Sequence, residues 1–217
     1  MGTATRTFEF RRGWSTDVTV TYQGVSGSPH DYVYGSVASG SGDLNGDGRA
    51  GNDLIYVPVD AHNINEIVFR DIPATSTTPL ITARQQADAF ENFIRNSKCL
   101  SKYRGQILPR NACRLPFSNQ VDLAIRQNVP IVRGQRLAVQ LDITNFGNLL
   151  NKKWGQVRVA EASANSNVPI LNHVGMTSND PKIAVPVFTF NVNQREYIIG
   201  NFASNYWRYQ LSARLSF

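Results

Sequence analysis

The sequence has 217 residues, of which 41% are apolar and 18% are charged, and its formal net charge is +6. This composition is typical of a folded chain, and nothing in it comes close to the run of about 18 apolar residues that forms a membrane-spanning helix. The Lys and Arg residues are scattered singly or in pairs, which argues against a nucleic-acid partner.

The N-terminal region predicts a β-hairpin. Its first arm covers residues 4–12 and carries Phe8 and Phe10 on one face, and its second arm, residues 16–25, alternates apolar and polar side chains. The two arms meet near Gly13, which suits a short turn.

The first long connection, about residues 26–118, contains a candidate calcium loop. Its sequence places oxygen side chains at alternate positions before a glycine, as the D-x-N-x-D-G opening of an EF-hand-like loop does. Leu54 stands at the twelfth position, where a bidentate Glu belongs, and an Asp precedes it by one place. The alternative is a polar turn that binds nothing. The expected ligands are the side chains of Asp43, Asn45, Asp47 and Asp53 and the backbone carbonyl of Arg49.

A short amphipathic helix is expected over residues 82–96 of the same connection. Thr82 and Gln85 have the spacing of a capping box, and apolar residues then recur at helical spacing from Ala83 to Ile94.

The two cysteines, Cys99 and Cys113, bracket a short polar stretch that follows this helix. A bridge between them would join the end of the helix to the strand that begins near Asn119, and it would place the segment in an oxidising compartment. The alternative is two unrelated thiols.

A second hairpin is predicted from residues 119–129 and 135–146, which alternate apolar and polar side chains. Pro130 and Gly134 lie in the connection between them and suit a tight turn between antiparallel neighbours.

The last eleven residues, 207–217, alternate in the same way, which predicts a strand with two unlike faces. This length exceeds the five or six residues usual in soluble proteins and fits a tilted membrane-spanning strand of about nine to eleven residues. Trp207 and Tyr209 at one end and Phe217 at the other match the aromatic girdles of such a barrel.

The connections alternate between short turns near Gly13 and Gly134 and long segments at about 26–118 and 147–205. Outer-membrane barrels have short periplasmic turns and long extracellular loops, so the long segments are expected to face outward. A further hairpin between residues 154–160 and 187–197 would leave the parity of the strands unchanged.

We therefore predict an all-β fold, an antiparallel transmembrane β-barrel segment that is partial and open, with long extracellular loops containing one short α-helix. Five spanning strands are an odd number, whereas single-chain bacterial barrels have even counts. The N-terminal residues also lack the apolar core of a secretory signal. Both features lead us to expect a fragment of a longer chain.

The sequence offers no enzymatic motif, and we predict that the chain is not an enzyme. His30, His62 and His173 lie far apart, and no serine or glycine-rich stretch matches a nucleophile or nucleotide motif. Asp88 and Glu91 fall at helical spacing, where a solvated helix face explains them. The aromatic residues in the proposed outer loops could contact a ligand such as a sugar or peptide, or serve girdle anchoring and packing; they are Tyr32, Tyr34, Tyr56, Tyr103 and Trp154.

Several stretches resemble the C-terminal part of TonB-dependent outer-membrane receptors, particularly the Oar-like group with an N-terminal carboxypeptidase-regulatory-like domain. Together these stretches touch most of the chain, and they are residues 42–48, 52–58, 99–106, 109–113, 145–155 and 209–217.

This resemblance implies the bacterial outer membrane, a barrel of about twenty-two strands filled by a plug, and energy drawn from TonB through that plug. The terminal residues Tyr209, Leu215 and Phe217 would form the signal that the barrel-assembly machinery reads. Residues 206–217 would close the barrel against another strand of the parent chain.

The function expected from the resemblance is the import of a bulky nutrient, such as an oligosaccharide, a peptide or a metal chelate. An alternative is a calcium-stabilised outer-membrane adhesin or binding module anchored by a barrel. A small stand-alone barrel is a third alternative, but the smallest barrels have about eight strands, more than the pattern provides.

Overall fold

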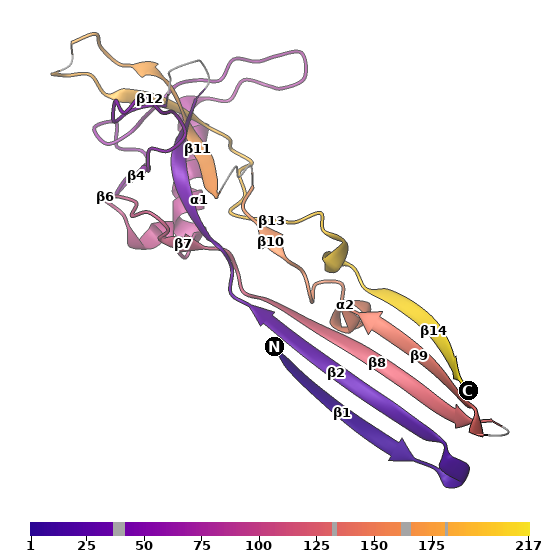
Figure 1. Ribbon diagram of the computed structural model, residues 1–217. Helices are drawn as coiled ribbons and strands as arrows, with labels where there is room; N and C mark the ends of the chain where they lie inside the picture. Colours follow the sequence, from indigo (N-terminus) through magenta and orange to yellow (C-terminus); the bar gives the residue numbers. More distant parts are fainter. Residues whose placement is uncertain (37–41, 132–133, 162–165, 181) are drawn as a thin grey trace. The chain divides into compact units, whose positions relative to one another are not determined.

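The computed structural model describes residues 1–36, 42–131, 134–161, 166–180 and 182–217. They form mostly β-sheet with two α-helices, and the chain divides into two compact units (Figure 1). The strand unit comprises residues 1–27, 116–158 and 199–217, and the loop unit comprises residues 28–115 and 159–198.

The strand unit is one antiparallel sheet in the order β1-β2-β8-β9-β14 (Figure 1). All five predicted strands are therefore confirmed. Within the described residues the sheet is open, because β1 and β14 pair on one side only, and no closed barrel is formed. The strands are β1 (Gly2–Glu9), β2 (Ser15–Val25), β8 (Ser118–Pro130), β9 (Arg136–Thr144) and β14 (Arg208–Ser216).

The pairing register aligns the apolar residues of these strands on one face. Leu141 of β9, for example, lies opposite Leu211 on one side and Ile125 on the other. Because a shift of one residue would turn every side chain to the opposite face, this register separates the two faces of the whole sheet. Val18, Val20, Leu123, Leu137, Val139, Ile143, Tyr209 and Leu215 share the apolar face, which also contains Arg6, Thr16 and Gln127.

The ends of β1 and β8 and the starts of β2 and β9 lie at one end of the sheet, and the chain leaves for its long segments from the other end. At that second end α2 (Phe146–Leu150) follows β9, a helix that the sequence analysis did not predict. Asn145 precedes it in the left-handed region, with φ 55°, and donates from Nδ2 to the carbonyls of Gly155 and Ser204.

Two further buried asparagines hold this end of the strand unit together. Asn148 donates from Nδ2 to the carbonyls of Lys152 and Trp154, and its Oδ1 accepts the N–H of Trp207. Asn205, in a 3-10 turn at Ala203–Asn205, accepts the N–H of Val157 at 2.6 Å. Much of the stretch 145–155 thus serves local packing.

The loop unit has a sheet of its own, in the order β5-β12-β11-β3-β7. The sequence analysis expected long loops with one short helix here and did not predict this sheet, in which the pairs β3–β11 and β5–β12 are parallel. A two-stranded ladder of β4 and β6 accompanies it. The strands are β3 (Pro29–Ser36), β4 (Tyr56–Val57), β5 (Val68–Phe69), β6 (Gln106–Ile107), β7 (Cys113–Arg114), β11 (Asn167–Met176) and β12 (Pro186–Phe190).

The predicted hairpin between residues 154–160 and 187–197 is also wrong. In the structure β12 pairs with β11 and β5, while β10 (Arg158–Val159) pairs with β13 (Ile198–Ile199). A short apolar run in this segment could pair with any of several strands. The packing of the loop unit determines which pairing forms.

Helix α1 (Ala83–Asn96) contributes buried residues to the core of the loop unit. The predicted capping box between Thr82 and Gln85 is present at its N-terminus. Its apolar face buries Ala87, Phe90 and Ile94, as the spacing predicts. Gln86 is buried as well, because it donates to the carbonyl of Arg70 and accepts the N–H of Phe190, which ties the helix to β12. Among the described residues, no helix is long and apolar enough to cross a membrane.

The predicted disulfide joins Cys99 to Cys113, with Cα atoms 5.4 Å apart. Cys99 precedes the 3-10 turn Leu100–Lys102, and Cys113 begins β7, which pairs with β3. The bridge therefore fixes the region after α1 to the edge of the loop unit's sheet.

Candidate functional site

The acidic loop, residues 43–53, is held by its own carboxylates. Asp43 accepts backbone N–H groups from Gly46, Asp47 and Gly48 at 2.8 to 3.1 Å. Gly46 and Gly48 have φ of 76° and 81° and therefore lie in the left-handed region. This conformation is strained for residues with a Cβ atom, so the loop needs glycine at both positions. The sequence thus folds into a tight turn organised around Asp43.

Asp53 lies at the far end of the acidic loop and is only 7% exposed. Its Oδ2 accepts the N–H groups of Leu44 at 2.6 Å and Asn45 at 3.0 Å. Its Oδ1 is buried and has no hydrogen-bond partner among the described residues, and the same is true of Oδ1 of Asn52. Each such oxygen costs about 1–3 kcal/mol unless a bound group donates to it.

Asp47 accepts the N–H of Arg49 on Oδ1, and its Oδ2 accepts from Nδ2 of Asn52 at 2.9 Å. These hydrogen bonds, the one from Asn52 first, lower the pKa of the Asp47 carboxyl. Asp47 is therefore ionised at neutral pH and leaves the loop with negative charge.

The described chain brings no group of three or more His, Cys, Asp or Glu side chains together in the manner of metal ligands. Asp43 and Asp47 use their oxygens within the loop, and Asp53 faces the start of the loop. Calcium binding by Asp43, Asn45, Asp47, Arg49 and Asp53 stays a prediction.

A cavity of about 450 Å³ opens beside the acidic loop, within the usual range for small-molecule sites. We call it the acidic-loop pocket. One part of its wall is polar, with Asp47, Asn52 and Asp53, and another is apolar, with Leu54 and Ile107.

Arg110 also lines the acidic-loop pocket. Its guanidinium donates to Oδ2 of Asp31 at 3.3 Å and to the carbonyl of Asn52 at 3.1 Å. The pocket therefore offers acceptor oxygens, a fixed positive group and an apolar wall, which can together orient a polar ligand.

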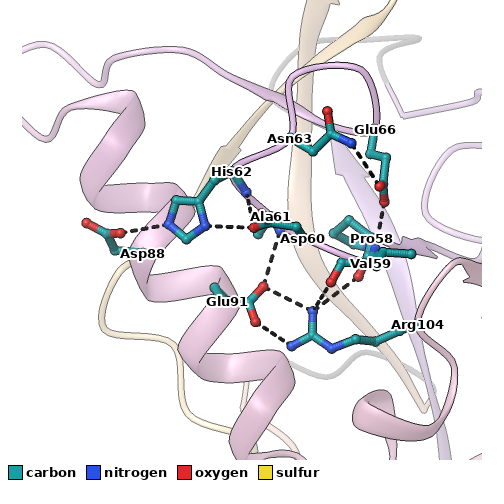
Figure 2. Close-up of polar contacts among 10 residues, drawn as sticks. All are labelled: Pro58, Val59, Asp60, Ala61, His62, Asn63, Glu66, Asp88, Glu91 and Arg104. Atoms are coloured by element: carbon teal, nitrogen blue, oxygen red, sulfur yellow. Dashed lines mark hydrogen bonds and ion pairs between the residues drawn. The ribbon is translucent and has the colours of Figure 1, made fainter.

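A second polar cluster joins the segment after β4 to helix α1 (Figure 2). His62 lies between Asp60 and Asp88, with each ring nitrogen 2.8 Å from a carboxylate oxygen. Because ionised carboxylates only accept, both ring nitrogens must donate, which favours the imidazolium. The hydrogen bond to Asp88, followed by that to Asp60, raises the pKa of His62.

In the same cluster Arg104 donates to both oxygens of Glu91, at 2.5 and 3.0 Å, and to the carbonyl of Val59 (Figure 2). Asp88, whose side chain is 54% exposed, lies on a solvated helix face as expected, whereas Glu91, at 23%, is partly buried by its pairing with Arg104. This cluster fixes the 58–66 segment against the helix, and nothing in its geometry provides a nucleophile.

The loop aromatics divide between the core and the surface. Tyr32 is fully buried and Tyr34 nearly so, with its ring stacked on Phe188, so both serve packing. Tyr56 lines the acidic-loop pocket, while Trp154 is exposed. Sequence reasoning pointed to Tyr56 but missed Asn52, because nothing in a sequence marks an amide whose oxygen is left unpaired.

The terminal strand is exposed along its whole length. Tyr209 stacks on Trp207, with ring centroids 6.3 Å apart, and Phe217 is 94% exposed. Leu215 shares the apolar face of the sheet with Tyr209.

Comparison with known proteins yields no match: no family model, no curated protein and no solved structure is similar to this chain.

Proposed function

We propose that this chain is the C-terminal part of the barrel of a TonB-dependent transporter in the bacterial outer membrane. The strand unit crosses the membrane, and the loop unit faces the exterior and contacts a bulky nutrient before import. The observation that carries this proposal is the two-faced sheet of the strand unit, with an uncovered apolar face.

The uncovered face favours lipid over another protein layer. None of the five strands contains a buried residue, and Leu211, in the middle of β14, is 67% exposed. A sheet in a soluble protein buries its apolar face against a second layer, whereas a transmembrane barrel turns that face to lipid tails. Strands of 9 to 13 residues, as in β2, β8, β9 and β14, fit the membrane thickness.

The opposite face has the polarity of a barrel interior. Threonine pairs Thr3–Thr21 and Thr5–Thr19 link β1 to β2 through their hydroxyls. Asn128 of β8 donates to Oδ2 of Asp17 at 3.0 Å. These polar contacts along the face suit contact with water or a plug.

The connections support an orientation. The strand ends joined by short connections lie at one end of the sheet, as at periplasmic turns, and the chain leaves for its long segments from the strand ends on the other side. A disulfide within the loop unit fits an oxidising compartment outside the cytoplasm.

The partners follow from this role. The open edges of β1 and β14 would pair with other strands of the parent barrel, and the polar face would contact the plug, through which TonB supplies energy. The apolar face would contact outer-membrane lipid. The barrel-assembly machinery would recognise Tyr209, Leu215 and Phe217. No enzymatic role and no nucleic-acid partner is proposed.

The proposal is tested by trypsin treatment of intact Gram-negative cells that express the gene product containing this chain. We expect cleavage after exposed basic residues of the loop unit, such as Arg49 and Lys182, and protection of Arg11 and Arg12 in a periplasmic turn. Lysed cells, in which both sides are accessible, provide the control. Cleavage at Arg11 in intact cells, or recovery of the protein in the soluble fraction, would contradict the proposal.

A calcium-stabilised adhesin or binding module is the second candidate, and the acidic loop favours it. Calorimetric titration of the full chain in detergent micelles with calcium separates the two. Heat of calcium binding that is present in the parent chain and absent in Asp47→Asn would support the calcium module. No heat in the parent chain would remove the main support for this candidate.

A further inference from the structure

Strand β1 places a charged side chain on the apolar face of the strand unit. Arg6 pairs in register with Val18 of β2, which pairs in turn with Ile125 of β8, so all three lie on that face. Among the described strand residues of this face, Arg6 is the only one with a charged side chain. It is exposed, and the part of the chain that the structure describes provides it with no ion-pair partner. Because an arginine stays charged, its counter-charge must come from outside these residues.

The Arg6 side chain reaches toward the end of the sheet at which β1 is joined to β2. Its guanidinium carbon lies 5.3 Å from the centroid of the Phe8 ring, and Phe8 is nearer that end of β1. Arg6 itself lies about 10 Å along the strand from Glu9, the last residue of β1. Long basic side chains in a membrane lay their stems on apolar surface and bring the charge to the interface in this manner. Arg6 therefore presents a positive charge where the apolar face meets the turn.

The turn after β1 adds further positive charge. Arg11 and Arg12 are exposed in the 3-10 turn that follows the strand. Trp14, at the end of this turn, is 44% exposed, as is typical of a residue at a membrane interface. The carboxylate of Glu9 belongs to the opposite face of β1 from Arg6, because side chains alternate along a strand. An exposed apolar face and a group of cations thus meet at this end of the sheet.

We propose that Arg6 binds the phosphate of an anionic phospholipid whose acyl chains lie on the apolar face beside Phe8 and Val18. A guanidinium offers N–H donors in a planar fork that fits two phosphate oxygens. Arg11 and Arg12 add attraction for a headgroup with net negative charge, such as that of phosphatidylglycerol. This inference rests on the proposed function, in which this face contacts lipid, and it adds which lipid the face prefers and where that lipid binds.

The test measures which lipid lies beside the turn after β1. Trp154 and Trp207 of the full chain are replaced by phenylalanine, and Trp14 is followed in vesicles that mix phosphatidylcholine with phosphatidylglycerol. Bromine is placed on the acyl chains of one lipid or of the other. We expect brominated phosphatidylglycerol to quench Trp14 with a relative affinity about fivefold or more above that of brominated phosphatidylcholine. Arg6→Gln should lose about fivefold of this preference, the effect of one cation at an anionic surface.

Arg126→Gln is the matched control. Arg126 of β8 is exposed and pairs in register with Asp17 on the polar face, beside the pair formed by Arg6 and Val18. Its removal should leave the preference for phosphatidylglycerol unchanged. Arg6→Lys keeps the charge and should retain most of the preference.

Nuclear magnetic resonance of the unaltered chain in zwitterionic micelles covers the case in which Arg6→Gln does not insert. Short-chain phosphatidylglycerol should shift the Nε–H signal of Arg6 and leave that of Arg126 in place. Equal quenching of Trp14 by the two brominated lipids, a preference that Arg6→Gln leaves intact, or an unshifted Arg6 signal would overturn this inference.

Quenching of Leu211→Trp by brominated lipid separates this inference from the proposed function. If tryptophan at position 211 is quenched and Trp14 shows no preference for phosphatidylglycerol, this inference fails and the proposed function stands. If neither position is quenched, the proposed function fails, and this inference fails with it.

Discussion

At His62 the two flanking carboxylates make the stability of the loop unit depend on pH. The pKa of His62 is raised in the folded chain, by the hydrogen bonds to Asp88 and Asp60. The stabilisation is therefore fully present below the unfolded pKa of about 6.5 and is lost as the pH rises through the folded value.

We predict that His62→Gln removes this component of the pH dependence. Thermal unfolding of the full chain in micelles, from about pH 5.5 to 8.5, should give curves for parent and variant that converge at high pH and separate at low pH, the parent being more stable. A constant difference across this range would contradict the assignment. Asn63→Ala, which removes a neighbouring amide without a titrating group, is the control.

At Asn148 one buried amide holds three backbone groups at the end of the strand unit. Asn148→Ala leaves the carbonyls of Lys152 and Trp154 without their donor, and we predict a loss of about 2 kcal/mol in the free energy of unfolding. The exposed Asn201→Ala should change it little. Urea unfolding of both variants measures the difference, and equal stabilities would refute the role of Asn148.

The residues of the acidic loop differ in how far their roles can be predicted from the sequence. Asp43, Asn45, Asp47 and Asp53 stand out because their spacing is a local pattern. The unpaired oxygen of Asn52 does not, because its condition depends on what the folded chain places around it.

Among the helices and strands, those defined by neighbouring residues could be predicted from the sequence, whereas strand pairings between distant segments could not. The capping box of α1 and the period-two strands of the sheet could be predicted because each depends on neighbours within a few residues. The parallel pairing of β3 with β11 joins segments far apart in the chain, and two-residue strands such as β4 and β5 carry no periodicity.

Strand β9 provides a matched pair for testing the faces of the sheet. Leu141 lies on the apolar face and Gln140 on the polar face. We predict that Leu141→Asp prevents stable assembly into lipid vesicles, because a carboxylate on the lipid-facing side is costly, whereas Gln140→Asp is tolerated. Recovery of folded, protease-resistant protein in the vesicle fraction measures this, and equal recovery of both variants would argue against a lipid-facing side.

At the scale of the whole chain, two units with different organisation share one sequence. The long segments were expected to be loops with a single helix, yet the structure gives them a common core in which Phe90 and Phe190 lie close together. The sequence could not predict this core, because it is assembled from residues of both long segments. The apolar runs in each segment are too short to indicate which other segment they pack against.

The proposed function depends on contact between lipid tails and the apolar face of the strand unit. Its most direct test places tryptophan at position 211 or 210, adjacent residues on opposite faces of β14, in a chain whose own tryptophans are replaced by phenylalanine, and measures quenching by brominated lipid in vesicles. We expect strong quenching for Leu211→Trp and weak quenching for Gln210→Trp. Equal quenching at the two positions, or none at 211, would contradict it.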